Sequence, residues 1–171
     1  MPVGALVRSV PGVKVTLRPM RPEEFPAFEA ESRERFVRDM SENGRVDPVA
    51  ARAKAERDFA RLLPEGLASP AQFLFVIEDE GGTGRGALWF AEEERNGRRC
   101  AFLYDIHVDG ASRGQGIGRG AMQLFEREAK ARGLESLELN VFGGNLVARD
   151  LYRSLGYSET FIGMRKELRS T

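Results

Sequence analysis

Glycine occupies three alternate positions just after an apolar run in the second half of this 171-residue chain. Residues 113–118 read Arg-Gly-Gln-Gly-Ile-Gly, between the apolar run 100–108 and a helical pattern from Ile117 to Arg132. Glycines let the main chain approach a ligand with no side chain in the way. A strand, a glycine turn and a helix start together aim free N–H groups and a positive helix end at one anion. The segment therefore predicts a site for a phosphate-bearing, nucleotide-like cofactor.

Composition excludes several kinds of partner. Lys and Arg number 26, as do Asp and Glu, so no overall field draws nucleic acid or an anionic membrane. The single cysteine, Cys100, and the single histidine, His107, give no metal-ligand spacing. No apolar run reaches the length of a membrane span. We therefore expect one cytoplasmic domain over residues 1–171, a monomer or homodimer, with no metal ion, nucleic-acid partner or membrane partner.

Periodicity and turn signals predict an α/β (α+β) fold around a mixed, mostly antiparallel sheet. Asp47-Pro48 is typical of an N-cap with proline at the first helical position, and Asn96-Gly97 of a hairpin turn. The expected strands are 13–17, 73–78, 87–91, 100–108, 137–141 and a final pair within 157–168; the expected helices are 22–40, 47–63, 117–132 and 145–155. The order is β-α-α-β-β-β-α-β-α-β-β, with six to seven strands and about four helices. The charged stretch 31–39 is expected to be a solvated helix face.

A dinucleotide-binding template shares part of the glycine segment. The spacing Gly116-x-Gly118-x-x-Ala121 matches that template, and Glu138 follows about twenty residues later, as the motif requires. The surrounding elements do not match, because a meander precedes the loop and only one further strand and helix follow directly. A Rossmann site is therefore disfavoured.

Two other templates and an inert turn are the remaining alternatives. Gly110-x-Ser112-x-Gly114 fits the nucleophile elbow of hydrolases, which needs a histidine after the serine. The only histidine, His107, precedes it. A Walker A loop is absent, since no Gly-Lys-Ser/Thr follows the glycines. A glycine-rich turn without a ligand stays open at this point.

Two blocks at the right separation resemble the GNAT superfamily of acetyl-CoA-dependent N-acetyltransferases. The first reads Arg113-x-x-Gly116-x-Gly118, after a strand that ends at Val108, and is similar to the pyrophosphate loop. The second reads Asn145-x-x-Ala148-x-x-Leu151-Tyr152-x-x-x-Gly156-Tyr157 and is similar to the last helix. The resemblance is close over about residues 100–168. Before residue 73 only the strand-helix-helix order agrees, in the part that shapes acceptor specificity in this family.

The resemblance implies a GNAT-like fold and a cofactor. Acetyl-CoA would donate its acetyl group directly to a primary amine of a small-molecule or peptide acceptor. Its pantetheine arm would pair with the main chain before the loop, and its pyrophosphate would bind the loop amides. The implied cofactor-binding residues are Ile106, His107, Val108, Arg113, Gly114, Gln115, Gly116, Ile117, Gly118, Arg119 and Asn145. A plain helix N-cap explains Asn145 almost as well.

Three further residues are candidates for chemistry or substrate binding. Tyr152 could protonate the leaving thiolate, unless it is simply an amphipathic core tyrosine. Asp105, unusual in its apolar strand, could accept the acceptor's proton, or could instead cap a loop or pair with an arginine. Strand alternation places it on one face with His107, itself more often a structural residue. Asn140, on the neighbouring strand, is a tentative substrate contact.

Two other functions are compatible with the same glycine loop. One is a non-catalytic acyl-CoA sensor or regulatory module, against which the presence of both Tyr152 and Asp105 argues. The other is a transferase for a larger acyl group, which needs more room beside the thioester.

Overall fold

The computed structural model describes residues 15–168, and it contains one five-stranded sheet and four α-helices in that part of the chain. The elements in chain order are β1 (Val15–Pro19), α1 (Phe25–Glu42), α2 (Pro48–Leu62), η1 (Gly66–Ala68), β2 (Gln72–Asp79), β3 (Gly84–Arg95), β4 (Arg98–Val108), η2 (Gly110–Ser112), α3 (Ile117–Ala131), β5 (Ser136–Leu139) and α4 (Leu146–Ser154). The four expected helices are confirmed. Residues 13 and 14 of the expected first strand lie outside the described part.

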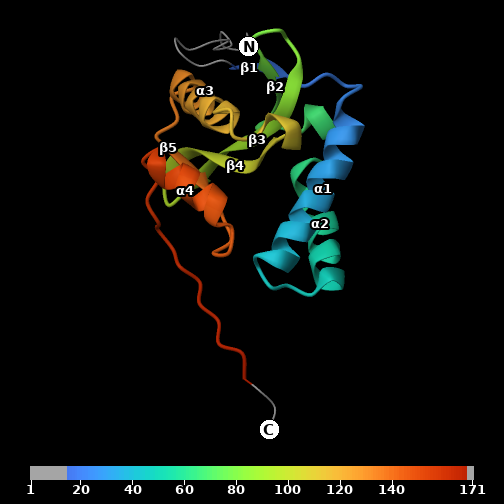
Figure 1. The fold of residues 1–171 in the computed structure, drawn as a ribbon, viewed down its shortest axis with the longest axis vertical. Coiled ribbons are helices and arrows are strands. Elements are labelled where there is room, and N and C mark those ends of the chain that lie inside the picture. The colour runs from blue at the N-terminus through green and yellow to red at the C-terminus, as the bar shows by residue number, and fades with distance from the viewer. Residues whose placement is uncertain (1–14, 169–171) are drawn as a thin grey trace.

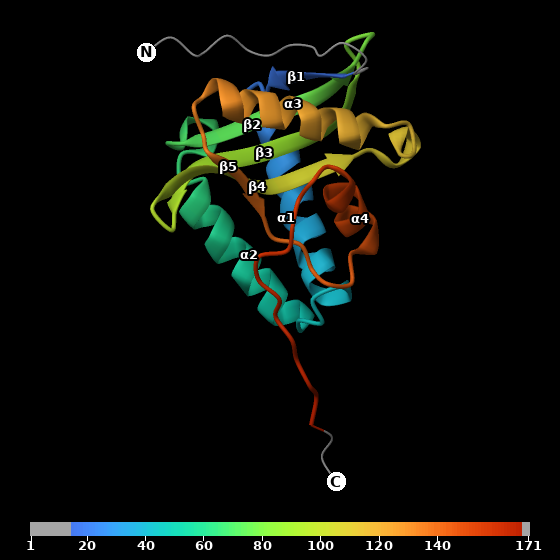
Figure 2. The same ribbon diagram turned by 90° about the vertical axis from the view of Figure 1, so that its left-hand side faces the viewer.

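The sheet follows chain order, β1-β2-β3-β4-β5. Its first four strands form an antiparallel meander, and β5 returns through α3 to pair parallel with β4. Figure 2 shows α3 across one face of the sheet, with α1 and α2 on the other side. The result is three layers, helix on sheet on helices, as expected for an α+β domain.

Strand alternation divides the core between the two faces. On β3, Leu88 and Phe90 pack in one cluster with α3, where the Phe90 and Phe125 ring centroids lie 5.0 Å apart. Trp89 points to the opposite face and contacts the rings of Phe28 and Phe59 at 6.4 and 5.4 Å. Because successive side chains of a strand point to opposite faces, one strand supplies both cores.

Asp47-Pro48 forms the predicted helix N-cap, and Asn96-Gly97 forms the predicted hairpin turn. The Asp47 carboxylate accepts from the N–H groups of Val49 and Ala50 at 3.0 and 3.1 Å, which caps α2. Asn96 and Gly97 both have positive φ, 52° and 75°, as a two-residue hairpin turn requires. Both features depend on a few neighbouring residues, so the sequence alone was enough to predict them.

The N-cap of α2 gives a stability prediction. Asp47→Ala should lower the free energy of unfolding by about 1 kcal/mol, because two first-turn N–H groups lose their acceptor. Asp58→Ala is the matched control, since Asp58 lies on the same helix in a surface pair with Lys54, where about 0.5 kcal/mol or less is expected. Urea unfolding of both variants would measure this, and equal losses would contradict the capping role.

The expected final pair of strands is wrong. None of residues 157–168 lies in a strand. Tyr157 packs on the core, and residues 158–168 run extended away from the sheet, as the red end of the chain in Figure 1 shows, with Arg165 donating to the Gly44 and Arg45 carbonyls at 3.2 Å. Glu159 accepts from Arg149 and Arg153 at 2.7 and 2.6 Å, which ties the start of this segment to α4. Phe161 is 88% exposed. The predicted six to seven strands and the order ending in two strands are therefore not matched. A physical reason is the length of β5, which has only four residues. Its outer edge is therefore short, and it offers little backbone with which another strand could pair.

Candidate active site

The parallel pairing of β4 with β5 stops halfway along β4. It runs from Cys100–Ser136 to Leu103–Leu139, after which the chain following β5 turns away. Residues 105–108 pair only with β3 and Tyr104 pairs with neither neighbour, so no strand covers the other edge of residues 104–108. Its N–H and C=O groups are open to a ligand, except that the Val108 carbonyl accepts from Arg113 Nε. At about 3.3 Å per residue this edge is about 16 Å long. The gap between the strands is where a long ligand can add itself to the sheet.

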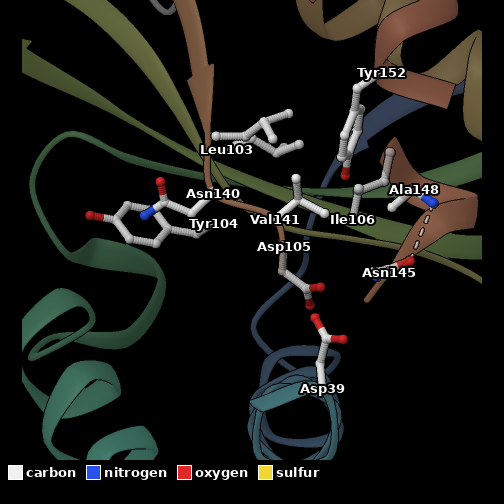
Figure 3. A pocket seen from close by; sticks show the side chains of 11 residues that line it. Asp39, Leu103, Tyr104, Asp105, Ile106, Asn140, Val141, Asn145, Ala148 and Tyr152 are labelled. Carbon is white, nitrogen blue, oxygen red and sulfur yellow. Dashed lines mark hydrogen bonds between the residues drawn. The ribbon is translucent and has the colours of Figure 1, made fainter. Parts of the chain in front are cut away.

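A pocket lies at this separation of the strands, with side chains from α1, β4, the end of β5, the segment after β5 and α4 (Figure 3). Its lining residues are Asp39, Leu103, Tyr104, Asp105, Ile106, Leu139, Asn140, Val141, Asn145, Ala148 and Tyr152. The structure thus brings together five of the predicted site residues. His107, Val108 and the glycine loop lie further along the same edge, toward α3.

The glycine loop directly follows the free edge. Gly114 and Gly116 have φ of 74° and 79°, in the left-handed region that favours glycine. Gly116 is the N-cap of α3 and supplies no side-chain acceptor. The first-turn N–H groups, including those of Ile117 and Gly118, have no acceptor inside the helix, and Gly120 is the first to donate, to the Gly116 carbonyl at 2.9 Å. Bare amides and the positive end of α3 therefore meet at one point.

Polar side chains beside the loop connect it to its neighbours. Arg113 Nε donates to the Val108 carbonyl at 3.1 Å, and Arg119 Nη2 donates to Ser154 Oγ at 2.7 Å. Gln115 Nε2 donates to the Ala111 carbonyl at 3.2 Å. Both arginines are exposed. Their guanidinium groups thus hold the loop and also leave positive charge beside it.

A β-bulge in β4 decides where Asp105 points. Trp89 of β3 pairs with Asp105 and Phe90 pairs with Leu103, so Tyr104 is an extra residue between them. Leu103 packs in the cluster under α3, and unbroken alternation would turn Asp105 to that same face. The bulge turns it to the α1 face instead. Nothing in the residue spacing predicted this bulge.

Asp105 is held by α1. Its Oδ2 accepts from Ser32 Oγ at 2.6 Å and from Arg35 Nη2 at 2.8 Å, which realises the predicted alternative of an arginine pair. Its Oδ1 has no hydrogen-bond partner within residues 15–168. Ser32 is buried, and Asp39 follows on the same helix at the pocket wall. The predicted solvated helix face over residues 31–39 is therefore wrong for Ser32, Arg35 and Asp39. These residues are three and four positions apart, and this spacing could have indicated that they share one face of the helix.

Tyr152 reaches the pocket from α4. Figure 3 shows its hydroxyl pointing toward Ile106 and Val141. Burial, with the charges of Asp105 and Asp39, raises the pKa of its phenol to about 12. The hydroxyl therefore stays protonated near neutral pH and is able to donate a proton or a hydrogen bond. The ring also packs on the main core, in agreement with the alternative prediction of an amphipathic core tyrosine.

The two asparagines differ in their surroundings. Asn145 Oδ1 accepts from the Ala148 N–H at 3.2 Å, so the N-cap role holds in this structure while the residue also lines the pocket. Asn140 lies just past β5, exposed at the pocket mouth. The substrate contact predicted for Asn140 stays a prediction.

His107 is mostly buried beside the same α1 face. Burial and the charge of Arg35 lower the pKa of its imidazole, so the ring is neutral near pH 7. Its Nδ1 is buried without a hydrogen-bond partner in the described chain, and Nε2 lies 3.6 Å from Asp109 Oδ1. His107 is thus a neutral side chain beside the Asp105 carboxylate.

Comparison with known proteins agrees with this geometry. A family model described as the acetyltransferase (GNAT) family matches residues 21–157. YdgE of Bacillus subtilis, an uncharacterized N-acetyltransferase, is 33% identical over 153 residues, which cover 90% of this chain and 98% of YdgE. The fold and the match define an acetyltransferase. The chain belongs to the GNAT family.

Solved structures show the same fold. The crystal structure of YycN from Bacillus subtilis, a putative acetyltransferase, matches with a TM-score of 0.85 and 29% identity, over 91% of this chain and 99% of YycN. A predicted acetyltransferase of Clostridium acetobutylicum, solved with acetyl-CoA, matches in fold with a TM-score of 0.61 and 18% identity, over 90% of this chain and 96% of that one.

Two kinds of feature are absent from residues 15–168. None of the helices there combines the length and apolar character that crossing a membrane requires. No group of three or more His, Cys, Asp or Glu side chains is arranged to hold a metal ion in that part of the chain.

Proposed function

We propose that this protein is an N-acetyltransferase that moves the acetyl group of acetyl-CoA directly to a primary amine of a small-molecule or peptide acceptor. The observation that carries the proposal is the free edge of β4, which runs from the Tyr152 pocket to the uncapped start of α3. A cofactor with a thioester at one end and a pyrophosphate further along fits these two ends. The names of YdgE and YycN, and the acetyl-CoA in the Clostridium acetobutylicum protein, support the same donor and reaction.

The main chain holds the cofactor in this proposal. The amides of Gln115, Gly116, Ile117 and Gly118 bind the pyrophosphate, with positive charge from Arg113 and Arg119 nearby. The pantetheine arm pairs with the free edge at residues 106–108, and Gly114 gives the loop its left-handed turn. A main-chain N–H of this edge polarises the thioester carbonyl. Asn145 contacts the cofactor near α4 while still capping that helix.

The reaction forms a C–N bond and breaks a C–S bond. The acceptor ammonium first gives one proton to Asp105, from which it passes to water. The neutral nitrogen then attacks the thioester carbonyl carbon, and the sulfur leaves with the electron pair of the C–S bond. Tyr152 gives its phenol proton to that sulfur and regains the second proton lost by the nitrogen. The products are the acetylated amine and coenzyme A in its thiol form.

Transfer without an acyl-enzyme intermediate fits the position of Cys100. This cysteine, the only one in the chain, is fully buried where β4 still pairs with β5. Burial raises the pKa of its thiol, which keeps it in the unreactive protonated form. Direct attack by the amine is therefore the simpler route.

Calorimetry and coenzyme A release test the proposal. We expect acetyl-CoA to bind the folded protein with measurable heat, and free coenzyme A to appear when amines are added. Binding without turnover on any amine would favour the sensor alternative. Tighter binding of propionyl-CoA or succinyl-CoA would favour a larger acyl donor. No heat with any of these ligands would refute the cofactor site itself.

A further inference from the structure

The acceptor side of the pocket carries two carboxylates from distant parts of the chain. Asp39 comes from α1 and Asp105 from β4; both line the pocket, and Figure 3 shows their carboxylates turned toward each other. The only cation paired with either in the described residues is Arg35, on Asp105 Oδ2. Arg35 is shared, because its Nη1 also lies 3.6 Å from Glu31. Asp39, Asp105 and Arg35 together therefore carry a net charge of −1, and the sharing of Arg35 with Glu31 makes the pocket more negative still.

The negative charge of Asp39 is less well balanced by neighbouring groups than that of Asp105. Its Oδ1 accepts from the neutral side-chain amide of Asn43, and its Oδ2 has no partner within residues 15–168. The charges of both carboxylates act on the pocket, since both help to raise the pKa of the Tyr152 phenol. Two facing carboxylates repel one another and favour a cation between them. An acceptor that brings its own carboxylate would add to the repulsion.

We propose that Asp39 and Asp105 bind the acceptor amine as an ammonium ion, so that the enzyme selects amines with no carboxylate on the adjacent carbon. This inference rests on the proposed N-acetyltransferase function and names its substrate class. Asp39 is then a substrate-binding residue on the side away from the thioester. Asp105 Oδ1 completes the ammonium site and takes its first proton.

A matched pair of acceptors tests the charge argument. A free amino acid and its C-terminal amide present the same α-amine, but only the first carries a carboxylate beside it. We expect wild type to prefer the amide in kcat/KM by about tenfold or more, as a loss of charge complementarity in a desolvated site predicts. Acetyl-CoA affinity is measured in parallel, because the acceptor site should not affect it.

Removing the charge of Asp39 should weaken this preference. Asp39→Asn should raise KM for the amide by about 10- to 100-fold, the range for a lost hydrogen bond to a charged group, with a much smaller change in kcat and none in acetyl-CoA affinity. Asp39→Glu, which keeps the charge, should retain the preference. Glu56→Gln removes an equal charge from an exposed site on α2 and should change nothing.

The outcomes separate the two proposals. If wild type acetylates acid and amide equally well, and Asp39→Asn does the same, the ammonium site is refuted while the transferase function stands. If wild type binds acetyl-CoA but acetylates no amine, both fall. A loss in Asp39→Asn that Asp39→Glu does not restore would make Asp39 a packing residue and would also overturn the inference.

Discussion

Gly116→Val should reduce acetyl-CoA affinity by 100-fold or more and leave the protein folded. The φ of 79° at Gly116 is strained for a β-branched residue, at about 1–2 kcal/mol. A Cβ at this position meets no protein atom within 4 Å, so no clash opposes folding. The valine side chain would instead cover the amides that hold the pyrophosphate in our proposal. Calorimetric titration with acetyl-CoA measures the effect.

Gly133→Val is the matched control for this experiment. Gly133 follows the other end of α3, with a φ of 70° and, again, nothing within 4 Å of a built Cβ. The two variants therefore carry the same backbone strain and should lose similar stability in thermal unfolding. Only Gly116→Val should lose affinity. Normal binding by Gly116→Val would refute the loop as the pyrophosphate site.

Tyr152→Phe should lower kcat by about 100-fold, at the lower end of the range for a lost proton donor, with little change in acetyl-CoA affinity. The variant removes only the hydroxyl that faces the pocket, while the ring remains to pack on the core. Because the pKa of the phenol is about 12, it stays protonated between about pH 6 and pH 10. The rate ratio of wild type to variant should therefore be constant over that range.

Tyr157→Phe provides the comparison for Tyr152. The two rings are neighbours, with centroids 5.6 Å apart, and the Tyr157 hydroxyl is buried without a hydrogen-bond partner in the described residues. Removing that hydroxyl should leave kcat unchanged. Equal rates for wild type and Tyr152→Phe would assign Tyr152 to packing, whereas equal losses in both variants would point to disturbance of the α4 region.

Features that depend on a few neighbouring residues could be predicted from the sequence, both at the glycine loop and at the start of α4. The positive φ of Gly116, the start of α3 and the N-cap role of Asn145 follow from a few neighbouring residues. The final strands were not, because a strand exists only when another edge pairs with it. The segment after Tyr157 has strand-like composition and no such partner among the described residues.

The sequence by itself determined the glycine loop, the helix that follows it and Tyr152 on the last helix, since backbone conformation and helical periodicity are set within short segments. Only the tertiary structure decided the acceptor side. The bulge at Tyr104 turns Asp105 toward α1, and packing brings Asp39 opposite it from a helix more than sixty residues earlier. Strand register and helix docking are settled by the energy of the whole core, and no local pattern in the chain encodes them.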